Sequence, residues 1–171
     1  MGDGEKKSPL IAVDTNVLLD LANDDELVID ALETVRRRLD GAEFIVTPTV
    51  IEEIALKAES PDTPLDRRLA HRVSGSLVYP WGFHPLNFIS VRRGIVAEVA
   101  RRIRREGIIP DDQVNDSLIL AEAAFVGATL LLSSDSHLKD IEYARLKIVL
   151  DAADVGTPLI ASPYKIVHHF F

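Results

Sequence analysis

The chain has 171 residues, a formal net charge of −8 and 47% hydrophobic residues. This size and composition indicate one ordinary folded domain, long enough to bury a core without cross-links. The absence of cysteine excludes a disulfide framework, a thiolate zinc site and a cysteine nucleophile. No run of about 18 apolar residues occurs, so the sequence predicts no membrane span.

The chain opens with the polar sequence MGDGEKKS, which has no apolar segment behind it and does not resemble a signal peptide. We therefore expect a flexible leader over residues 1–8, a single domain over residues 9–171 and a cytoplasmic location. Positive charge gathers between Asp66 and Arg105, where nine arginines face only two acidic residues. The remainder is strongly acidic, so the sequence predicts two charged faces with different roles.

Hydrophobic spacing predicts strands that alternate with helices. The strands are expected at 10–13, 44–46, 88–91, 128–132 and 158–161. The helices are expected at 15–21, 26–39, from Thr47 or Pro48 onward, 65–73, 92–105, 112–126, 143–153 and after Ser162. Alternation of this kind is typical of an α/β fold with three layers, in which helices cover both faces of a central parallel sheet. In such sheets the functional site lies beyond the carboxyl ends of the strands.

Four acidic residues are predicted to lie near that edge. Asp14 follows the first strand, and Glu53 comes soon after the second. Asp116 lies in the first turns of a buried helix, and Asp135 follows the central strand. Carboxylates gathered in one place repel one another, and a divalent cation such as Mg²⁺ or Mn²⁺ relieves the repulsion. Bound ions of this kind polarise phosphoryl groups and activate water. The alternative is that Asp14 or Thr15 only caps a helix, and both roles can hold together.

Asp112 and Glu52 lie beside this acidic set. Asp112 precedes Asp116 by one helical turn and could be a fifth acidic neighbour, although a helix cap is the favoured interpretation. Glu52 points about 100° away from Glu53 on a helix, toward solvent. His137 is the only histidine near the predicted site, and a surface role is favoured for it.

Four sequence stretches contain the acidic residues and the closing segment of the expected fold: VDTNVLLDL, VTPTVIEEIA, NDSLILAEAAFVGATLLLSSD and PLIASPYKIV. In this order and spacing they resemble the PIN-domain family of metal-dependent nucleases, in its VapC-like toxin branch. The resemblance runs from Leu10 to about Val167. It departs over residues 60–105, an Arg-rich insertion that is longer and more basic than in the compact toxins.

The resemblance implies a Mg²⁺- or Mn²⁺-dependent endoribonuclease that hydrolyses single-stranded RNA to a 5′-phosphate and a 3′-hydroxyl. It makes Asp14, Asp116 and Asp135 the metal ligands, with Glu53 assisting a metal or orienting the water. Three neighbours, Asn16, Ser133 and Thr15, would position the carboxylates through hydrogen bonds. An antitoxin protein is the expected partner if the chain is the toxin of a toxin–antitoxin pair.

The helix expected over 92–105 suggests where RNA would bind. With Ile95, Val99 and Ile103 as its buried stripe, four arginines lie on or beside the outer face: Arg93, Arg101, Arg104 and Arg105. Either they form a phosphate track or they are a solvated face that makes salt bridges. Similarly, Trp81, Phe83 and Phe88 could stack on bases, although a loop core or an oligomer contact is favoured.

Two further hypotheses concern the whole protein. A catalytically inert PIN-like protein-interaction module is the alternative function, although such a descendant would be expected to lose acidic ligands. The apolar end YKIVHHFF suggests a homodimer.

Overall fold

The computed structural model describes residues 7–60 and 63–169, so most of the expected leader and the last two residues lie outside the described part. Five strands form one sheet: β1 (Leu10–Val13), β2 (Glu43–Val46), β3 (His84–Pro85), β4 (Leu130–Leu132) and β5 (Leu159–Ala161). The helices are α1 (Thr15–Ala22), α2 (Glu26–Arg38), α3 (Pro48–Glu59), α4 (Pro64–Ser76), α5 (Ser90–Arg105), α6 (Val114–Phe125), α7 (Ser136–Lys139), α8 (Tyr143–Asp151) and α9 (Pro163–His169).

The sheet is parallel throughout, in the order β3-β2-β1-β4-β5. Ile11 in the central strand pairs with Phe44 on one side and Leu130 on the other. This register aligns the last residues of the four longer strands, which are Val13, Val46, Leu132 and Ala161. The residues that follow these strands therefore meet at one edge, and the predicted α/β fold is confirmed.

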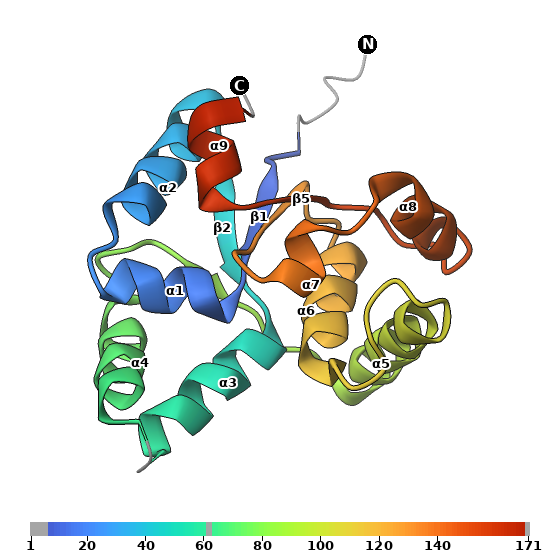
Figure 1. Cartoon of the computed structure of the whole chain (residues 1–171), viewed down its shortest axis with the longest axis horizontal. Coiled ribbons are helices and arrows are strands. Elements are labelled where there is room, and N and C mark those ends of the chain that lie inside the picture. The colour runs from blue at the N-terminus through green and yellow to red at the C-terminus, as the bar shows by residue number, and fades with distance from the viewer. Residues whose placement is uncertain (1–6, 61–62, 170–171) are drawn as a thin grey trace.

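Helices cover both faces of the sheet (Figure 1). One layer holds α1, α2, α4 and α9, in which α2 packs against α9 and α1 against α4. The other holds α5, α6 and α8, with α5 packed against both others. Helix α3 contacts α4 and α6, so it joins the two layers below the sheet edge. Along β1 and β4 the side chains are buried on both faces, which explains why these strands are continuous apolar runs in the sequence.

The Arg-rich stretch builds part of the domain, since residues 64–105 supply α4, β3 and α5. Whether it is an insertion, and where the domain begins and ends, stay predictions. The strand predicted at 88–91 is wrong: β3 lies at His84–Pro85, beside Ile45 and Val46. Phe88 is instead buried against Phe125, with 5.7 Å between ring centroids. A proline is tolerated in β3 because this strand is at the edge of the sheet.

The buried stripe of α5 is rotated by about one residue from the predicted one. Val99 and Ile103 are buried as expected, but Val96 takes the place of Ile95, which is 45% exposed.

The helix cap predicted at Asp112 is wrong, because α6 begins at Val114 and Asp112 lies exposed in the turn before it. Within the described residues, no helix is long and apolar enough to cross a membrane.

Candidate functional site

Asp14 lies at the centre of the carboxyl edge. Its backbone N–H donates to the Leu132 carbonyl (2.9 Å), which continues the pairing of β1 with β4. The carboxylate accepts one hydrogen bond from the backbone N–H of Thr15 and one from the Ser133 hydroxyl, both at 2.7 Å. Asp14 is therefore the N-cap of α1, and its carboxylate is held at the sheet edge. Its role as a metal ligand stays a prediction.

The electrostatic setting of Asp14 is unfavourable for charge. The side chain is buried, and this burial raises its pKa from 3.8 to about 6. The hydrogen bonds from Ser133 and Thr15 oppose the increase, whereas the negative charges of Glu53 and Asp116 add to it. Asp14 is thus electrostatically coupled to two of the acids that the sequence predicts for the site.

Glu53 reaches the edge from the first turns of α3. One carboxylate oxygen accepts a short hydrogen bond from the Thr15 hydroxyl, and the other accepts one from the Asn115 side-chain amide at 2.7 Å. Thr15 therefore contacts two acids, through its backbone on Asp14 and through its hydroxyl on Glu53. Asn115 was missed in the sequence, where its place directly before Asp116 is the only signal.

Asp116 and Asp135 complete the set. Burial raises the pKa of Asp116 to about 6, and the charges of Asp135 and Glu53 act in the same direction, while His137 lowers it. The carboxylate of Asp135 accepts the backbone N–H of His137 at 2.7 Å. The Ser133 hydroxyl accepts the backbone N–H of Asp135 at 3.0 Å while it donates to Asp14, so it joins these two acids.

The carboxylate oxygens at this edge are ligands of the kind that a hard divalent cation binds. Four carboxylates influence one another there, and no lysine or arginine forms a salt bridge with any of them among the described residues. Oxygen ligands with unbalanced negative charge are what Mg²⁺ and Mn²⁺ select. In the described ranges no three acidic or histidine side chains already stand in a finished ligand arrangement, so the side chains would have to close around an ion.

Asn16 differs from Ser133 and Thr15 in its surroundings. Its side chain is exposed at the start of α1, and in the described part of the chain it makes no hydrogen bond to a carboxylate of the site. A positioning role for Asn16 stays a prediction. Ser133 and Thr15, by contrast, make the contacts expected of residues that position acids.

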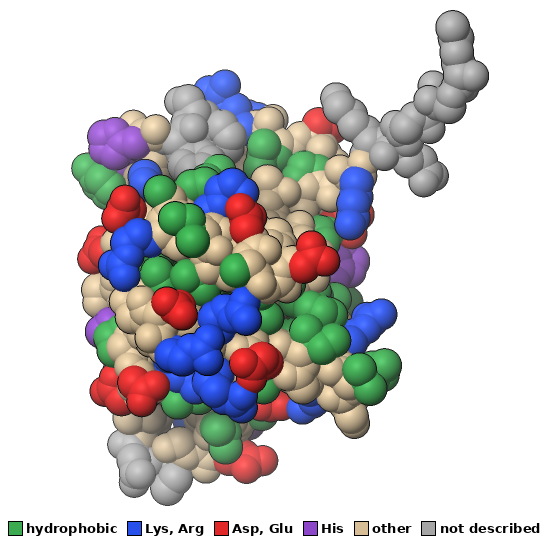
Figure 2. Space-filling model, turned by 90° about the vertical axis from the view of Figure 1, so that its right-hand side faces the viewer, with side chains coloured by type: hydrophobic (Ala, Val, Ile, Leu, Met, Phe, Trp, Pro, Cys, Tyr) green, Lys and Arg blue, Asp and Glu red, His purple; other side chains and the backbone are tan. Residues whose placement is uncertain are grey.

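The four arginines proposed for RNA differ in their surroundings. Arg101 and Arg105 are exposed and lie next to Glu98 and Glu106, and Arg93 pairs with Glu52 at 3.3 Å. Figure 2 shows basic side chains gathered on the face formed by α5 and α8, with acidic ones among them. Arg104 does not belong to this surface, because its side chain is only 15% exposed and donates to the Ser117 hydroxyl.

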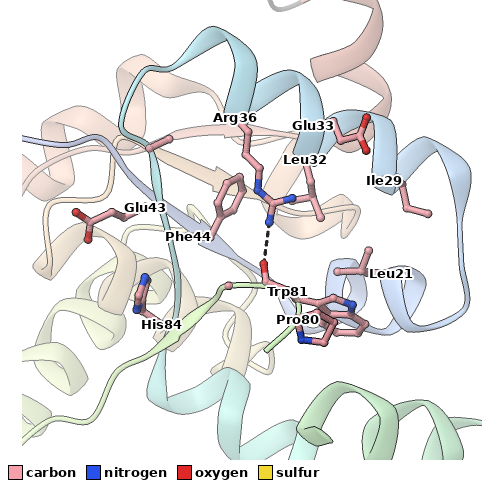
Figure 3. Close-up of a pocket in the computed structure, with 12 residues that line it drawn as sticks. Leu21, Ile29, Leu32, Glu33, Arg36, Glu43, Phe44, Pro80, Trp81 and His84 are labelled. Atoms are coloured by element: carbon pink, nitrogen blue, oxygen red, sulfur yellow. Dashed lines mark hydrogen bonds between the residues drawn. The ribbon is translucent and has the colours of Figure 1, made fainter. Parts of the chain in front are cut away.

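A separate pocket of about 470 Å³ lies between α2, the amino end of β2 and the loop before β3 (Figure 3). The Arg36 guanidinium lies 4.9 Å from the centre of the Phe44 ring and donates to the Trp81 carbonyl at 2.9 Å. Trp81 and Phe44 both pack edge-on against the buried Phe83. Trp81 and Phe83 thus belong to a loop core, as favoured, and none of the four acids lines this pocket.

Comparison with known proteins identifies a family and similar folds. The sequence profile of the PIN domain matches residues 11–143. No curated protein matches the chain. Three solved structures share the fold at low sequence identity.

The first is VapBC2 from Rickettsia felis bound to a DNA fragment from their promoter, with 13% identity, a TM-score of 0.58, and 90% of this chain and 98% of that chain covered. The second is FitAB bound to IR36 DNA, with 18% identity, a TM-score of 0.55, and 94% and 99% covered. The third is FitAcB from Neisseria gonorrhoeae, with 16% identity, a TM-score of 0.53, and 90% and 98% covered.

Proposed function

Because the chain belongs to the PIN-domain family, we propose that it is a metal-dependent endoribonuclease that hydrolyses phosphodiesters of single-stranded RNA. The observation that supports this most is the gathering of Asp14, Glu53, Asp116 and Asp135 at one sheet edge, where the charges of these acids affect one another's protonation. A cluster of this kind is strained without a cation, and a bound cation removes the strain.

The acids would hold Mg²⁺ or Mn²⁺ with Asp14, Asp116 and Asp135 as ligands and Glu53 beside them. The bound ion would polarise a phosphoryl oxygen and lower the pKa of water toward neutral pH. The chain itself supplies the geometry. Ser133 and Thr15 fix the Asp14 carboxylate, while Thr15 and Asn115 hold the two oxygens of Glu53 in place.

RNA must approach an acidic edge, so it needs a basic surface nearby to hold its backbone. Arg93 contacts α3, the helix that carries Glu53, because it pairs with Glu52 on the exposed side of that helix. Arg101 and Arg105 extend the exposed positive charge along α5. We assign phosphate binding to these three arginines. Arg104 instead holds the start of α6 through Ser117.

The direct test is cleavage of structured and unstructured RNA by the purified protein with Mn²⁺ or Mg²⁺, beside the variants Asp14→Asn and Asp112→Asn. Asp112 is the matched control, because it is an exposed acid two residues before α6, and its charge is not among those that raise the pKa of Asp14 or Asp116. We expect cleavage to be lost in Asp14→Asn and kept in Asp112→Asn. Equal cleavage by wild type and Asp14→Asn, or none by any protein across metals, would refute the nuclease.

We further propose that the nuclease is the toxin of a toxin–antitoxin pair, since the similar structures carry the paired names VapBC2 and FitAB and two of them hold DNA. A short reading frame directly upstream that encodes a small DNA-binding protein would support the pair. Co-expression of the two proteins should then yield a complex with reduced RNA cleavage. A solitary gene would favour an independent ribonuclease.

A homodimer stays a prediction, and the fold weakens the sequence argument for it. Part of the apolar C-terminal segment is used inside the chain, because α9 packs on α2 and Ile166 is buried. The last two phenylalanines lie outside the described residues. Sedimentation at micromolar concentration is expected to show a dimer, and a monomer would contradict it.

A further inference from the structure

Glu122 is a carboxyl group in the interior of the domain that the proposed site does not use. It lies on α6, six residues after Asp116, and it is only 4% exposed. No cation pairs with it in the described residues. Burying an acid without an opposite charge costs free energy, so a glutamate at this position needs hydrogen bonds that offset the cost.

Those hydrogen bonds come from the start of α3. The backbone N–H of Thr49 donates to both Glu122 oxygens, at 3.2 and 3.1 Å, and the Thr49 hydroxyl donates to one of them at 2.8 Å. Thr47, the N-cap of α3, makes no side-chain cap hydrogen bond of its own. The first turn of a helix has free N–H groups that need acceptors. Glu122 therefore caps α3 from a different helix.

This cap lies one turn from an acid of the proposed site. Thr49 and Glu53 are four residues apart, so they occupy the same face of α3. Glu53 in turn accepts the side-chain amide of Asn115, which is on α6. Helix α6 thus holds α3 at two points on one face, Thr49 through Glu122 and Glu53 through Asn115.

We propose that Glu122 is a positioning residue: it fixes the start of α3 and thereby sets the place of Glu53 beside Asn115 and Asp116. An apolar side chain would fill the same space but would leave the Thr49 N–H without an acceptor. Helix α3 would then be free to shift along α6. The link from this geometry to metal binding rests on the proposed function, whereas the geometry itself can be measured without metal.

The test compares Glu122→Gln with Glu122→Leu. Glutamine keeps an acceptor for Thr49, and leucine has similar size but no acceptor. The control is Leu120→Ala, at a fully buried residue of the same helix, which should lower stability but removes no hydrogen bond to Thr49 or Glu53, because leucine has no polar side-chain atom. The primary measurement is the ¹⁵N–¹H signal of the Asn115 side-chain amide in metal-free protein. The second is Mn²⁺ affinity by calorimetry.

In Glu122→Leu we expect the Asn115 amide signals to move toward those of a free amide, and Mn²⁺ to bind about 10-fold or more weakly, as is typical when support of a ligand is lost. Glu122→Gln should keep the Asn115 signals and most of the affinity. Leu120→Ala should melt at a lower temperature with both readouts unchanged below its transition.

Unchanged Asn115 signals in Glu122→Leu would overturn the proposal, and so would equal changes in Leu120→Ala, which would reduce Glu122 to general core stability. If Glu122→Leu does not fold, Glu122→Met, which also lacks a strong acceptor but adapts its shape more easily, must shift the same signals, or the proposal fails. Shifted Asn115 signals in a protein that binds no Mn²⁺ would keep the positioning role and refute the proposed function instead.

Discussion

The carboxyl group of Asp14 is subject to two opposing influences. Hydrogen bonds from Thr15 and Ser133 favour its charged form, whereas burial and the neighbouring acids disfavour it. Burial is the larger effect, so the pKa is raised to about 6. This arrangement suits cation binding. The carboxylate is held rigidly, and a nearby positive charge would stabilise the charged form that burial disfavours.

The raised pKa makes stability depend on pH in metal-free buffer. The folded protein holds the Asp14 proton more tightly than the unfolded chain, so the added stability is present below pH 4 and is lost as pH rises through about 6. The change for this buried group is on the order of 2 to 3 kcal/mol. Urea unfolding with EDTA should therefore give a lower free energy of unfolding at pH 8 than at pH 5.

Asp14→Asn is the control for this pH dependence, since asparagine carries no charge at either pH. Its free energy of unfolding at pH 8 without metal should exceed that of the wild type, and the difference should shrink toward pH 5. A variant that is equally or less stable at pH 8 would show that Asp14 is not strained.

Asn115 offers a second prediction at the scale of one residue. Asn115→Ala removes the donor to Glu53, and because the side chain is exposed, the melting temperature should change little. Mn²⁺ affinity or RNA cleavage should fall about 10- to 100-fold, as for other residues that orient ligands. Val114→Ala, at an exposed neighbour, is the control, and equal losses in both variants would contradict the role.

Helix α5 shows how neighbouring residues of one type separate into different roles. Its buried face carries Val96, Val99, Ala100 and Ile103, and this face decides which arginines reach solvent. Arg101 and Arg105 point outward, but Arg104 lies against the start of α6. Replacing all of the arginines together would therefore mix loss of charge with loss of packing.

The two effects can be separated by variant. Arg101→Ala with Arg105→Ala should leave the melting temperature unchanged and weaken binding of single-stranded RNA. The dependence of log affinity on log salt should flatten by about 0.7 for each phosphate group that the variant no longer binds. Arg104→Ala should instead lower the free energy of unfolding by about 1 to 3 kcal/mol, because it removes a charged hydrogen bond to the buried Ser117 hydroxyl and the packing of a side chain that is only 15% exposed.

The control for the surface pair is Arg37→Ala with Arg38→Ala, an exposed pair on the opposite layer. If both pairs change the salt dependence of RNA affinity equally, binding follows the net charge of the protein and α5 is not a specific phosphate-binding surface. If neither changes it, the arginines of α5 form a solvated face.

At the scale of the whole molecule, metal binding and folding are linked. A ligand that binds only the folded state stabilises it by about 2.7 kcal/mol at 100 times its Kd. For a domain of this size, each kcal/mol raises the melting temperature by about 2 to 4 °C. Saturating Mn²⁺ should therefore raise the wild-type Tm by roughly 5 to 10 °C.

Asp14→Asn should show little or no such rise, whereas Asp112→Asn should respond as the wild type does. Scanning calorimetry with a Mn²⁺ titration is the measurement. An equal rise in Asp14→Asn would place the ion elsewhere on the protein.

The sequence alone determined the parallel α/β fold and the place of its acidic edge. Strands β1 and β4 are continuous apolar runs, and Asp14 and Asp135 follow them by one and three residues. Because parallel strands end together, chain order by itself predicts that these acids share an edge. Local patterns of this kind depend only on neighbours in sequence, so they can be recognised without a structure.

Contacts between segments far apart in the chain were decided only by the tertiary structure. Asn115 reaches Glu53 across 62 residues, and Glu122 reaches Thr49 across 73. The rotation of α5, which buries Val96 and leaves the Arg104 side chain only 15% exposed, follows from its packing on α6 and α8. Such partners are set by how whole helices dock, and a helical repeat gives the face of a residue only to within about one position. The apolar pattern therefore specifies the layers, and the docking of α3 against α6 specifies which polar side chains meet.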